Sequence, residues 1–155
     1  MPFRMFYGIS MTLKSSLKWD KVMFKIHKKV KYALTALKYM KKKPSRELST
    51  AKEICSVFNI PFDPTSRVLQ VMAQNGILMA VQGAYGGYRL TGDLGKVSVY
   101  ELSRMVVGSI SVSDCTSDDS QCDRLDACVL KEGMARLNAR LVKMFKEINV
   151  SEMVG

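Results

Sequence analysis

The sequence predicts a mainly α-helical fold with a small β-hairpin wing: a winged helix-turn-helix followed by a long C-terminal dimerisation helix. Two short helical patterns stand close together between residues 50 and 75, which is the outline of a helix-turn-helix. Two short strand patterns then flank the glycine-rich stretch GAYGG, as in a wing. A long amphipathic segment near the end of the chain has the spacing of a helix–helix seam.

The first helix is expected between Phe24 and Met40. Apolar residues recur there at helical spacing, while lysines cover the other face. Pro44 follows and ends the helix.

The second helix opens on TAKE, Thr50 to Glu53, which fits a capping box. The third helix lies in DPTSRVLQVMAQNG. We expect Asp63 to cap it and Pro64 to occupy its first position, and we expect Asn75–Gly76 to end it.

The wing is predicted from ILMAVQ and YRL, which read as an outgoing and a returning strand. Of Tyr85 and Tyr88, at least one is expected to pack against the hairpin. Another capping box, SVYE, opens the next helix, which Gly108 ends.

The last long helix carries an apolar stripe with alternating steps of four and three residues. This spacing favours a seam between two long helices of a homodimer. The alternative, that the stripe covers the core of the same subunit, stays open. The stripe consists of Leu130, Met134, Leu137, Leu141, Met144 and Ile148.

These patterns divide the chain into four regions. Residues 1–22 are an N-terminal tail, either disordered or the product of a start assigned too early, since Met23 opens the first patterned segment. Residues 23–108 form the winged helix-turn-helix, 109–128 a cysteine-rich cluster loop, and 129–155 the dimerisation helix with the C-terminal tail.

The net charge of +10 suggests a polyanionic partner, most simply double-stranded DNA. No apolar run approaches the ~20 residues of a membrane span, and no cleavage site follows the apolar N-terminal patch, so we expect a cytoplasmic protein without a membrane partner. The chain has one histidine and no pairing of a nucleophile with a base. We therefore expect neither an enzyme nor a small-molecule substrate.

Three cysteines lie in an acidic loop: Cys115, Cys122 and Cys128. In a cytosolic chain such thiols favour metal binding or redox chemistry over disulfides. Soft thiolates suit iron–sulfur clusters and zinc, but structural zinc usually takes four ligands and a Cys-x-x-Cys knuckle, which the loop lacks. Spacing alone leaves a metal site and ordinary surface thiols equally open. The fourth cysteine, Cys55, is expected in the core.

The segments KVKYALTALKYM, LSTAKEIC, VLQVMAQNGIL and VQGAYGGYRL, followed by the three-cysteine loop, resemble the Rrf2 family of bacterial winged-helix regulators. The resemblance covers about residues 23 to 150. It implies a homodimer that binds DNA and holds an iron–sulfur cluster, [2Fe–2S] or [4Fe–4S], near the dimer helix, with Cys115, Cys122 and Cys128 as ligands.

Two features depart from the family pattern. The cysteines are separated by six and five residues instead of the usual five and five. The fourth ligand does not carry over either, because Lys131 stands where IscR-like members have a histidine and Lys31 where NsrR-like members have an aspartate. His27 is a weak candidate for this ligand; the alternative is a solvated histidine on a lysine-rich face.

The third helix is the expected reader of the major groove. Its first turns would present Thr65, Ser66, Arg67 and Gln70 to base edges or phosphates. The wing would add Gln82 and Arg89, and its glycines permit close approach to the DNA backbone. Lysines at the first helix, Lys28, Lys29 and Lys31, would add contacts to phosphates, although for each one a purely solubilising charge is the simpler interpretation.

The sequence thus predicts a DNA-binding transcriptional regulator, a repressor, whose operator binding an iron–sulfur cluster modulates in response to iron, redox state or nitric oxide. One alternative is a thiol-redox or zinc-containing winged-helix regulator without iron. Another is an iron–sulfur electron carrier or cluster scaffold, which would leave the third helix and the wing without a role.

Overall fold

The computed structural model describes residues 25–44, 46–108, 110–111, 116 and 128–155. Within these ranges the chain forms helices and one two-stranded antiparallel sheet. In chain order they are α1 (Lys28–Lys41), α2 (Ala51–Phe58), α3 (Phe62–Gln74), β1 (Leu78–Val81), β2 (Gly87–Leu90), α4 (Val99–Val107), α5 (Lys131–Glu147) and α6 (Val150–Met153).

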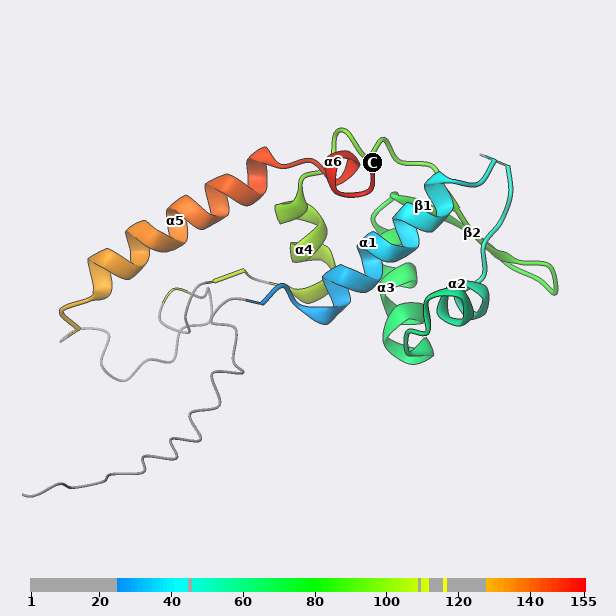
Figure 1. The fold of residues 1–155 in the computed structure, drawn as a ribbon, viewed down its shortest axis with the longest axis horizontal. Helices are drawn as coiled ribbons and strands as arrows, with labels where there is room; N and C mark the ends of the chain where they lie inside the picture. Colours follow the sequence, from blue (N-terminus) through cyan, green and yellow to red (C-terminus); the bar gives the residue numbers. More distant parts are fainter. Residues whose placement is uncertain (1–24, 45, 109, 112–115, 117–127) are drawn as a thin grey trace, which may run out of the picture.

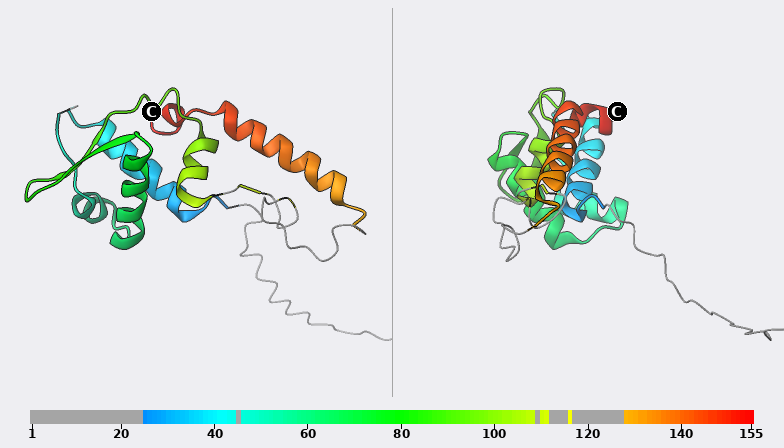
Figure 2. Two further views of the ribbon diagram at one scale, coloured as in Figure 1. Left: turned by 180° about the vertical axis from the view of Figure 1, so that it is seen from behind. Right: turned by 90° about the vertical axis from the view of Figure 1, so that its left-hand side faces the viewer.

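The predicted winged helix-turn-helix is confirmed. Helices α2 and α3 pack against each other and against α1, and the β1–β2 hairpin directly follows α3. The hairpin register pairs Leu78 with Leu90 and Val81 with Gly87. The hairpin projects at one end of the molecule and α5 extends away at the other, as the front and back views both show (Figures 1 and 2). No helix in the described ranges is long and apolar enough to cross a membrane.

Both predicted capping boxes are present. The Thr50 hydroxyl accepts a hydrogen bond from the Glu53 amide at 3.1 Å, and the Glu53 carboxylate accepts one from the Thr50 amide at 3.2 Å. Ser98 and Glu101 repeat the arrangement at the start of α4. The expected ends of α3 and α4 are also confirmed, at Asn75 and Gly108. Each box satisfies backbone amides that a helix start would otherwise leave unpaired.

The start of α1 was predicted too early. The helix begins at Lys28, and residues 25–27 before it are not helical. His27 is the cap, and its Nδ1 accepts a hydrogen bond from the Lys29 amide at 3.2 Å. Apolar spacing alone could not show this, because a side-chain cap ends the helical backbone whatever pattern precedes it.

The start of α3 also differs from the prediction. Pro61, in an extended conformation, is the N-cap residue, and the helix begins at Phe62. Asp63 is therefore the second helical residue and not the cap, and Pro64 is the third residue and not the first. The Thr65 hydroxyl donates to the Pro61 carbonyl at 2.7 Å, which fixes the turn in which the helix starts.

The hydrophobic core lies between α1, α3 and α4, and the end of the chain packs into it as well. Val150 is fully buried and Val154 is 2% exposed. The Val99 amide donates to the Ile148 carbonyl and the Val150 amide to the Val97 carbonyl, each at 2.8 Å. The chain end after α5 is thereby tied to the start of α4.

The wing is fixed to the helix-turn-helix by a short backbone bridge. Ser49, just before α2, and Tyr88 in β2 exchange two hydrogen bonds of 2.8 Å. Gly87 beside them has no room for a side chain, since a Cβ atom there would lie 2.9 Å from the Ser49 carbonyl oxygen. The orientation of the wing relative to α2 is therefore set by backbone contacts.

Candidate functional site

Helix α3 has one buried and one exposed face. Its buried residues are Thr65, Val68, Leu69 and Met72. Besides Phe62 at its start, its exposed residues follow helical spacing on the opposite side: Asp63, Arg67, Gln70 and Gln74. The exposed stripe is the part of α3 that can enter a DNA groove.

Thr65 does not belong to the candidate DNA surface. Its side chain is completely buried, and its hydroxyl is used in the hydrogen bond to Pro61. The prediction that Thr65 faces DNA was wrong because a threonine in the first turn can satisfy the backbone turn before the helix. Ser66 is half-buried, whereas Arg67 and Gln70 are exposed.

A groove of about 520 Å³ separates α2 and α3 from the hairpin. Gln70 of α3 and Gln82 of the wing both line it, together with Thr50 at the start of α2. Glycines 83, 86 and 87 form its wing side and keep it free of bulky side chains. Two amide side chains, each able to donate and accept hydrogen bonds, thus border the same groove.

The wing presents Tyr85 at its tip, where the side chain is 96% exposed. Tyr88 is the tyrosine that packs, because it lies half-buried against the core. Arg89 sits lower on the hairpin, opposite Met79, and one guanidinium nitrogen lies 3.0 Å from the Met79 sulfur. The thioether is a weak acceptor. A stronger hydrogen-bond acceptor could therefore replace it as the partner of Arg89.

The first turn of α1 is basic, with exposed Lys28, Lys29 and Lys31 and no acidic residue. Cations at a helix N-terminus are unfavourable with respect to the helix dipole. His27 lies beside them, in a pocket that is also lined by Ile110 and Ser111, beyond the α4 C-cap Gly108. Contact with an anionic partner would offset the unfavourable placement of these lysines.

The N-cap role of His27 argues against its prediction as a metal ligand. Because Nδ1 accepts a hydrogen bond from the Lys29 amide, the neutral ring carries its proton on Nε2. A metal ion on Nε2 would need that proton moved to Nδ1, and the cap would then be lost. The arrangement therefore suits His27 to capping α1 better than to metal binding.

Of the cysteine loop, the structure describes residues 110–111, 116 and 128. Cys115 and Cys122 lie outside the described residues. Cys128 is half-buried three residues before α5, and its carbonyl accepts a hydrogen bond from the Lys131 amide at 3.2 Å. No group of three or more potential metal ligands occurs in the part of the chain that the structure describes.

The donor set is nevertheless compatible with an iron–sulfur cluster. Thiolates are the usual ligands of such clusters, and Cys128 is held next to the start of α5, where the helix dipole favours a negatively charged group. Cys55 is 8% exposed in α2, and its thiol faces the Pro61 carbonyl. It lies in the core, as predicted.

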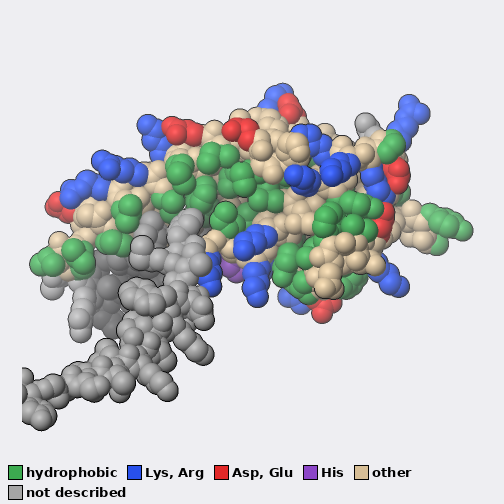
Figure 3. Space-filling view, viewed as in Figure 1, with side chains coloured by type: hydrophobic (Ala, Val, Ile, Leu, Met, Phe, Trp, Pro, Cys, Tyr) green, Lys and Arg blue, Asp and Glu red, His purple; other side chains and the backbone are tan. Residues whose placement is uncertain are grey.

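Helix α5 carries an uncovered apolar stripe. Of its residues only Phe145 is buried, whereas Leu137 is 50% exposed and Met144 45%. Hydrophobic side chains follow one side of this helix and lysines and arginines the other (Figure 3). Of the stripe residues, Leu130, Leu137 and Met144 are exposed, whereas Met134, Leu141 and Ile148 are half-buried.

Comparison with known proteins decides the family. The Rrf2 family profile, described as an iron-dependent transcriptional regulator, matches residues 26–155. The chain belongs to the Rrf2 family. The HTH-type transcriptional regulator NsrR of Shouchella clausii (strain KSM-K16) is 21% identical to this Rrf2 protein over 124 residues, which cover 79% of this chain and 83% of NsrR.

Solved structures of similar fold include two named regulators. CymR (YrzC), the global cysteine regulator of B. subtilis, superposes with a TM-score of 0.63 at 19% identity, covering 84% of this chain and 96% of CymR. IscR of T. potens gives a TM-score of 0.62 at 18% identity, with 84% and 86% covered. These structures share the fold. Membership of the Rrf2 family of transcriptional regulators shows that the protein is a transcriptional regulator and not an enzyme, as the sequence predicted.

Three exposed side chains of this Rrf2 protein were not among the predicted DNA contacts. Asp63 and Gln74 extend the exposed stripe of α3 at both ends, and Tyr85 stands free at the wing tip. The spacing of Asp63, Arg67, Gln70 and Gln74 was available in the sequence. It was obscured because Asp63 before a proline resembles a helix cap.

Proposed function

We propose that this Rrf2 protein is a homodimeric repressor whose operator binding depends on an iron–sulfur cluster held by Cys115, Cys122 and Cys128. The observation that carries the proposal is the position of Cys128 at the entrance to α5. A cluster attached there would couple its own gain or loss to the helix with the uncovered apolar stripe. The description of the family as iron-dependent adds support.

DNA reading is assigned to the exposed side of α3 and to the wing. Arg67 can donate two hydrogen bonds to a guanine, and Gln70 can pair with an adenine edge. Ser66 at the rim of this face would reach a phosphate. Gln82 and Arg89 of the wing, with Lys28 and Lys29 of α1, would contact phosphates and so contribute affinity without sequence preference.

The cluster would act by changing the distance between the winged helix-turn-helix domains of the two subunits. Helix α5 leads through α6 into the core of the winged helix-turn-helix, so a shift of α5 is passed to α3 through packed side chains. Loss or oxidation of the cluster is then the signal. A fourth ligand that is weak or exchangeable would make the cluster labile, which suits a sensor.

The test is anaerobic purification followed by a visible spectrum and by iron and sulfide analysis. We expect a coloured protein whose operator affinity changes when the cluster is removed. The Cys115→Ala/Cys122→Ala/Cys128→Ala variant should lose both the colour and the change in affinity. Cys55→Ala, which removes a thiol from the core, should keep both. A cluster-free protein with unchanged operator binding would contradict the proposal.

A second candidate is thiol-based sensing without iron. Support comes from the fold shared with S. aureus CymR, solved in an oxidized form, which superposes with a TM-score of 0.62 at 19% identity. The six-residue gap between Cys115 and Cys122 also departs from the usual family spacing. A colourless protein whose operator affinity changes with oxidation of the loop thiols would favour this candidate, and one that contains zinc would indicate a zinc-stabilised regulator.

A further inference from the structure

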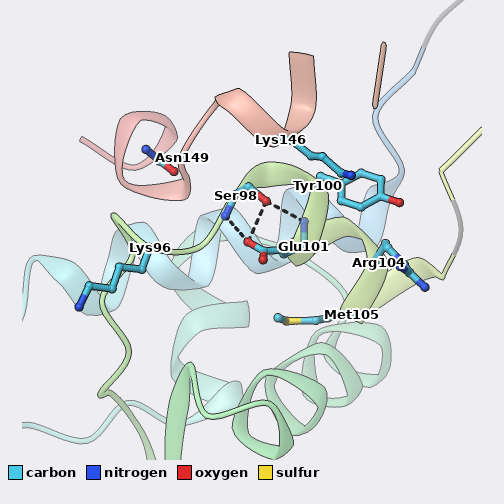
Figure 4. A pocket seen from close by; sticks show the side chains of 8 residues that line it. All are labelled: Lys96, Ser98, Tyr100, Glu101, Arg104, Met105, Lys146 and Asn149. Carbon is cyan, nitrogen blue, oxygen red and sulfur yellow. Dashed lines mark hydrogen bonds between the residues drawn. The ribbon is translucent and has the colours of Figure 1, made fainter. Parts of the chain in front are cut away.

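A groove of about 640 Å³ lies where the loop before α4, α4 itself and the end of α5 meet (Figure 4). Three cationic side chains line it, and each comes from a different segment: Lys96 from the loop, Arg104 from α4 and Lys146 from α5. Its volume is in the range of sites that bind small organic ligands. None of its lining residues belongs to the wing.

Two of the cations lie beside the ring of Tyr100. The guanidinium carbon of Arg104 lies 5.9 Å from the centroid of the Tyr100 ring, and Nζ of Lys146 lies 5.0 Å from it. Attraction to the ring offsets part of the repulsion between the two positive charges. Within the described ranges neither Arg104 nor Lys146 forms an ion pair with a carboxylate.

The carboxylate among the lining residues, Glu101, is already engaged. One of its oxygens accepts hydrogen bonds from the amide and the hydroxyl of Ser98, both at 2.8 Å. These bonds, with a contribution from Lys146, hold the pKa of Glu101 below its ordinary value. With three positive charges and one negative charge, the lining has a formal net charge of +2. Asp93, outside the lining, lies 3.8 Å from Nζ of Lys96 and reduces this to +1.

The groove also spans a structural junction. Beside it, the Val99 amide donates to the Ile148 carbonyl at 2.8 Å, and Ser98 forms a backbone bridge with Asn149. A ligand in contact with Arg104 and Lys146 would tie α4 to α5 at this junction. The same ligand would favour one orientation of α5 over others, since it binds only the orientation that completes its site.

We propose that this groove binds a small organic anion with two or more negative charges on phosphate or carboxylate groups. Arg104 and Lys146 supply the complementary charge beside the ring of Tyr100, and Lys96, which pairs with Asp93 at 3.8 Å, lies at the edge of the groove. Bound anion fixes α5 relative to α4. The binding stands independently of the cluster, whereas its consequence for operator affinity rests on the proposed function.

The test is calorimetric titration of the full-length protein at constant ionic strength, with inorganic pyrophosphate and citrate as probes. We expect saturable binding of at least one probe, with one site per chain. The Arg104→Gln/Lys146→Gln variant should bind about tenfold more weakly or worse. Lys143→Gln is the matched control, because Lys143 lies on the same helix but pairs with Glu147 at 3.8 Å outside the groove.

Each outcome separates the possibilities. Binding of pyrophosphate alone identifies a phosphorylated ligand, and binding of citrate alone a carboxylated one. Absence of saturable binding overturns the proposal. An equal loss of affinity in Lys143→Gln also overturns it, because the probe would then respond only to the overall charge of the protein. Displacement by an acidic peptide or by duplex DNA at similar concentration also overturns it. The triple-cysteine variant should bind the probe with unchanged affinity. A failure of the cluster proposal can therefore be told apart from a failure of the anion-site proposal.

Discussion

The hydroxyl of Tyr39 on α1 donates a hydrogen bond of 2.5 Å to Oε1 of Glu53 on α2. The ammonium group of Lys43, just after α1, reaches the same oxygen at 2.6 Å. The other oxygen of Glu53 takes part in the capping box of α2. One carboxylate therefore both starts the first helix of the helix-turn-helix and ties it to α1.

This carboxylate predicts an acid-sensitive contribution to stability. Hydrogen bonds from Lys43 and then Tyr39 hold the pKa of Glu53 below its ordinary value of 4.5. The stabilisation is therefore complete above the unfolded-state pKa and is lost as the pH falls through the folded-state pKa. Glu53→Gln should lower the melting temperature at neutral pH, and this difference should shrink below about pH 4.5. Thermal unfolding followed by circular dichroism across this range measures it.

The control for this prediction is Glu147→Gln. Glu147 forms an exposed pair with Lys143 at 3.8 Å, and such pairs contribute little to stability. Its substitution should change the melting temperature only slightly at any pH. A Glu53→Gln difference that stays constant down to acidic pH would show that lost packing, and not the charge, is responsible.

Arg67 is predicted to set sequence preference. Arg67→Ala should cost about 1–3 kcal/mol in operator binding and relax the preference at one base pair. Lys28→Ala should weaken binding to all sequences alike and reduce its salt dependence, because it would lose only a phosphate contact. Selection of bound fragments from a random DNA pool, followed by fluorescence anisotropy at several salt concentrations, distinguishes the two.

Thr65 gives the matched comparison on the same helix. Because its hydroxyl is buried and bonded to the Pro61 carbonyl, Thr65→Val should lower stability by about 1–3 kcal/mol. The preferred DNA sequence should stay the same. A changed sequence preference in Thr65→Val would mean that the turn before α3 rearranges on DNA.

The stripe on α5 predicts a homodimer contact. Leu137→Glu/Met144→Glu places charges on the exposed apolar side of α5 and should convert a dimer into monomers. Ala139→Glu is the control, since Ala139 is exposed on a different side of the same helix. Light scattering coupled to gel filtration gives the mass of each variant. A dimer that survives the double substitution would place the interface elsewhere.

The sequence could predict the helices whose ends are marked by side chains. The boxes at Thr50 and Ser98 were found because they need specific residues three positions apart. The starts of α1 and α3 were misplaced because His27 and Pro61 are uncommon caps, and their role depends on backbone conformation that no spacing reveals. Helix α6 was missed for a related reason, since four residues are too few to show a period.

The sequence predicted some residues of the candidate sites and not others, because some positions depend on backbone conformation and packing. Arg67 and Gln70 follow from helical periodicity once α3 is located, but the burial of Thr65 depends on the turn that precedes it. The anion groove joins Lys96 and Arg104, which are close in sequence, to Lys146, which is far from both. Only the packing of α5 against α4 brings Lys146 to the other two, so no local pattern could have indicated the whole site.

The junction of wing and helix-turn-helix supports a last prediction, at Gly87. A Cβ atom at this position would lie 2.9 Å from the backbone oxygen of Ser49, which cannot move like a side chain. Gly87→Ala should therefore weaken the two hydrogen bonds between Ser49 and Tyr88, lower the melting temperature and speed hydrogen exchange at both amides. DNA affinity should fall as well, because the wing loses its fixed orientation.

Gly133 is the matched control for Gly87. It lies in the first turn of α5, and a Cβ atom there would meet nothing within 4 Å. Gly133→Ala should stabilise the protein by up to about 1 kcal/mol, because alanine is the better helix former. If glycine-to-alanine substitution lowers stability at Gly87 but raises it at Gly133, the cause at Gly87 is the close approach of the Ser49 backbone. The loss of a glycine as such would then not explain the effect on the wing. Unchanged exchange at Ser49 and Tyr88 in Gly87→Ala would show that the bridge tolerates a methyl group and that the wing is held by other contacts.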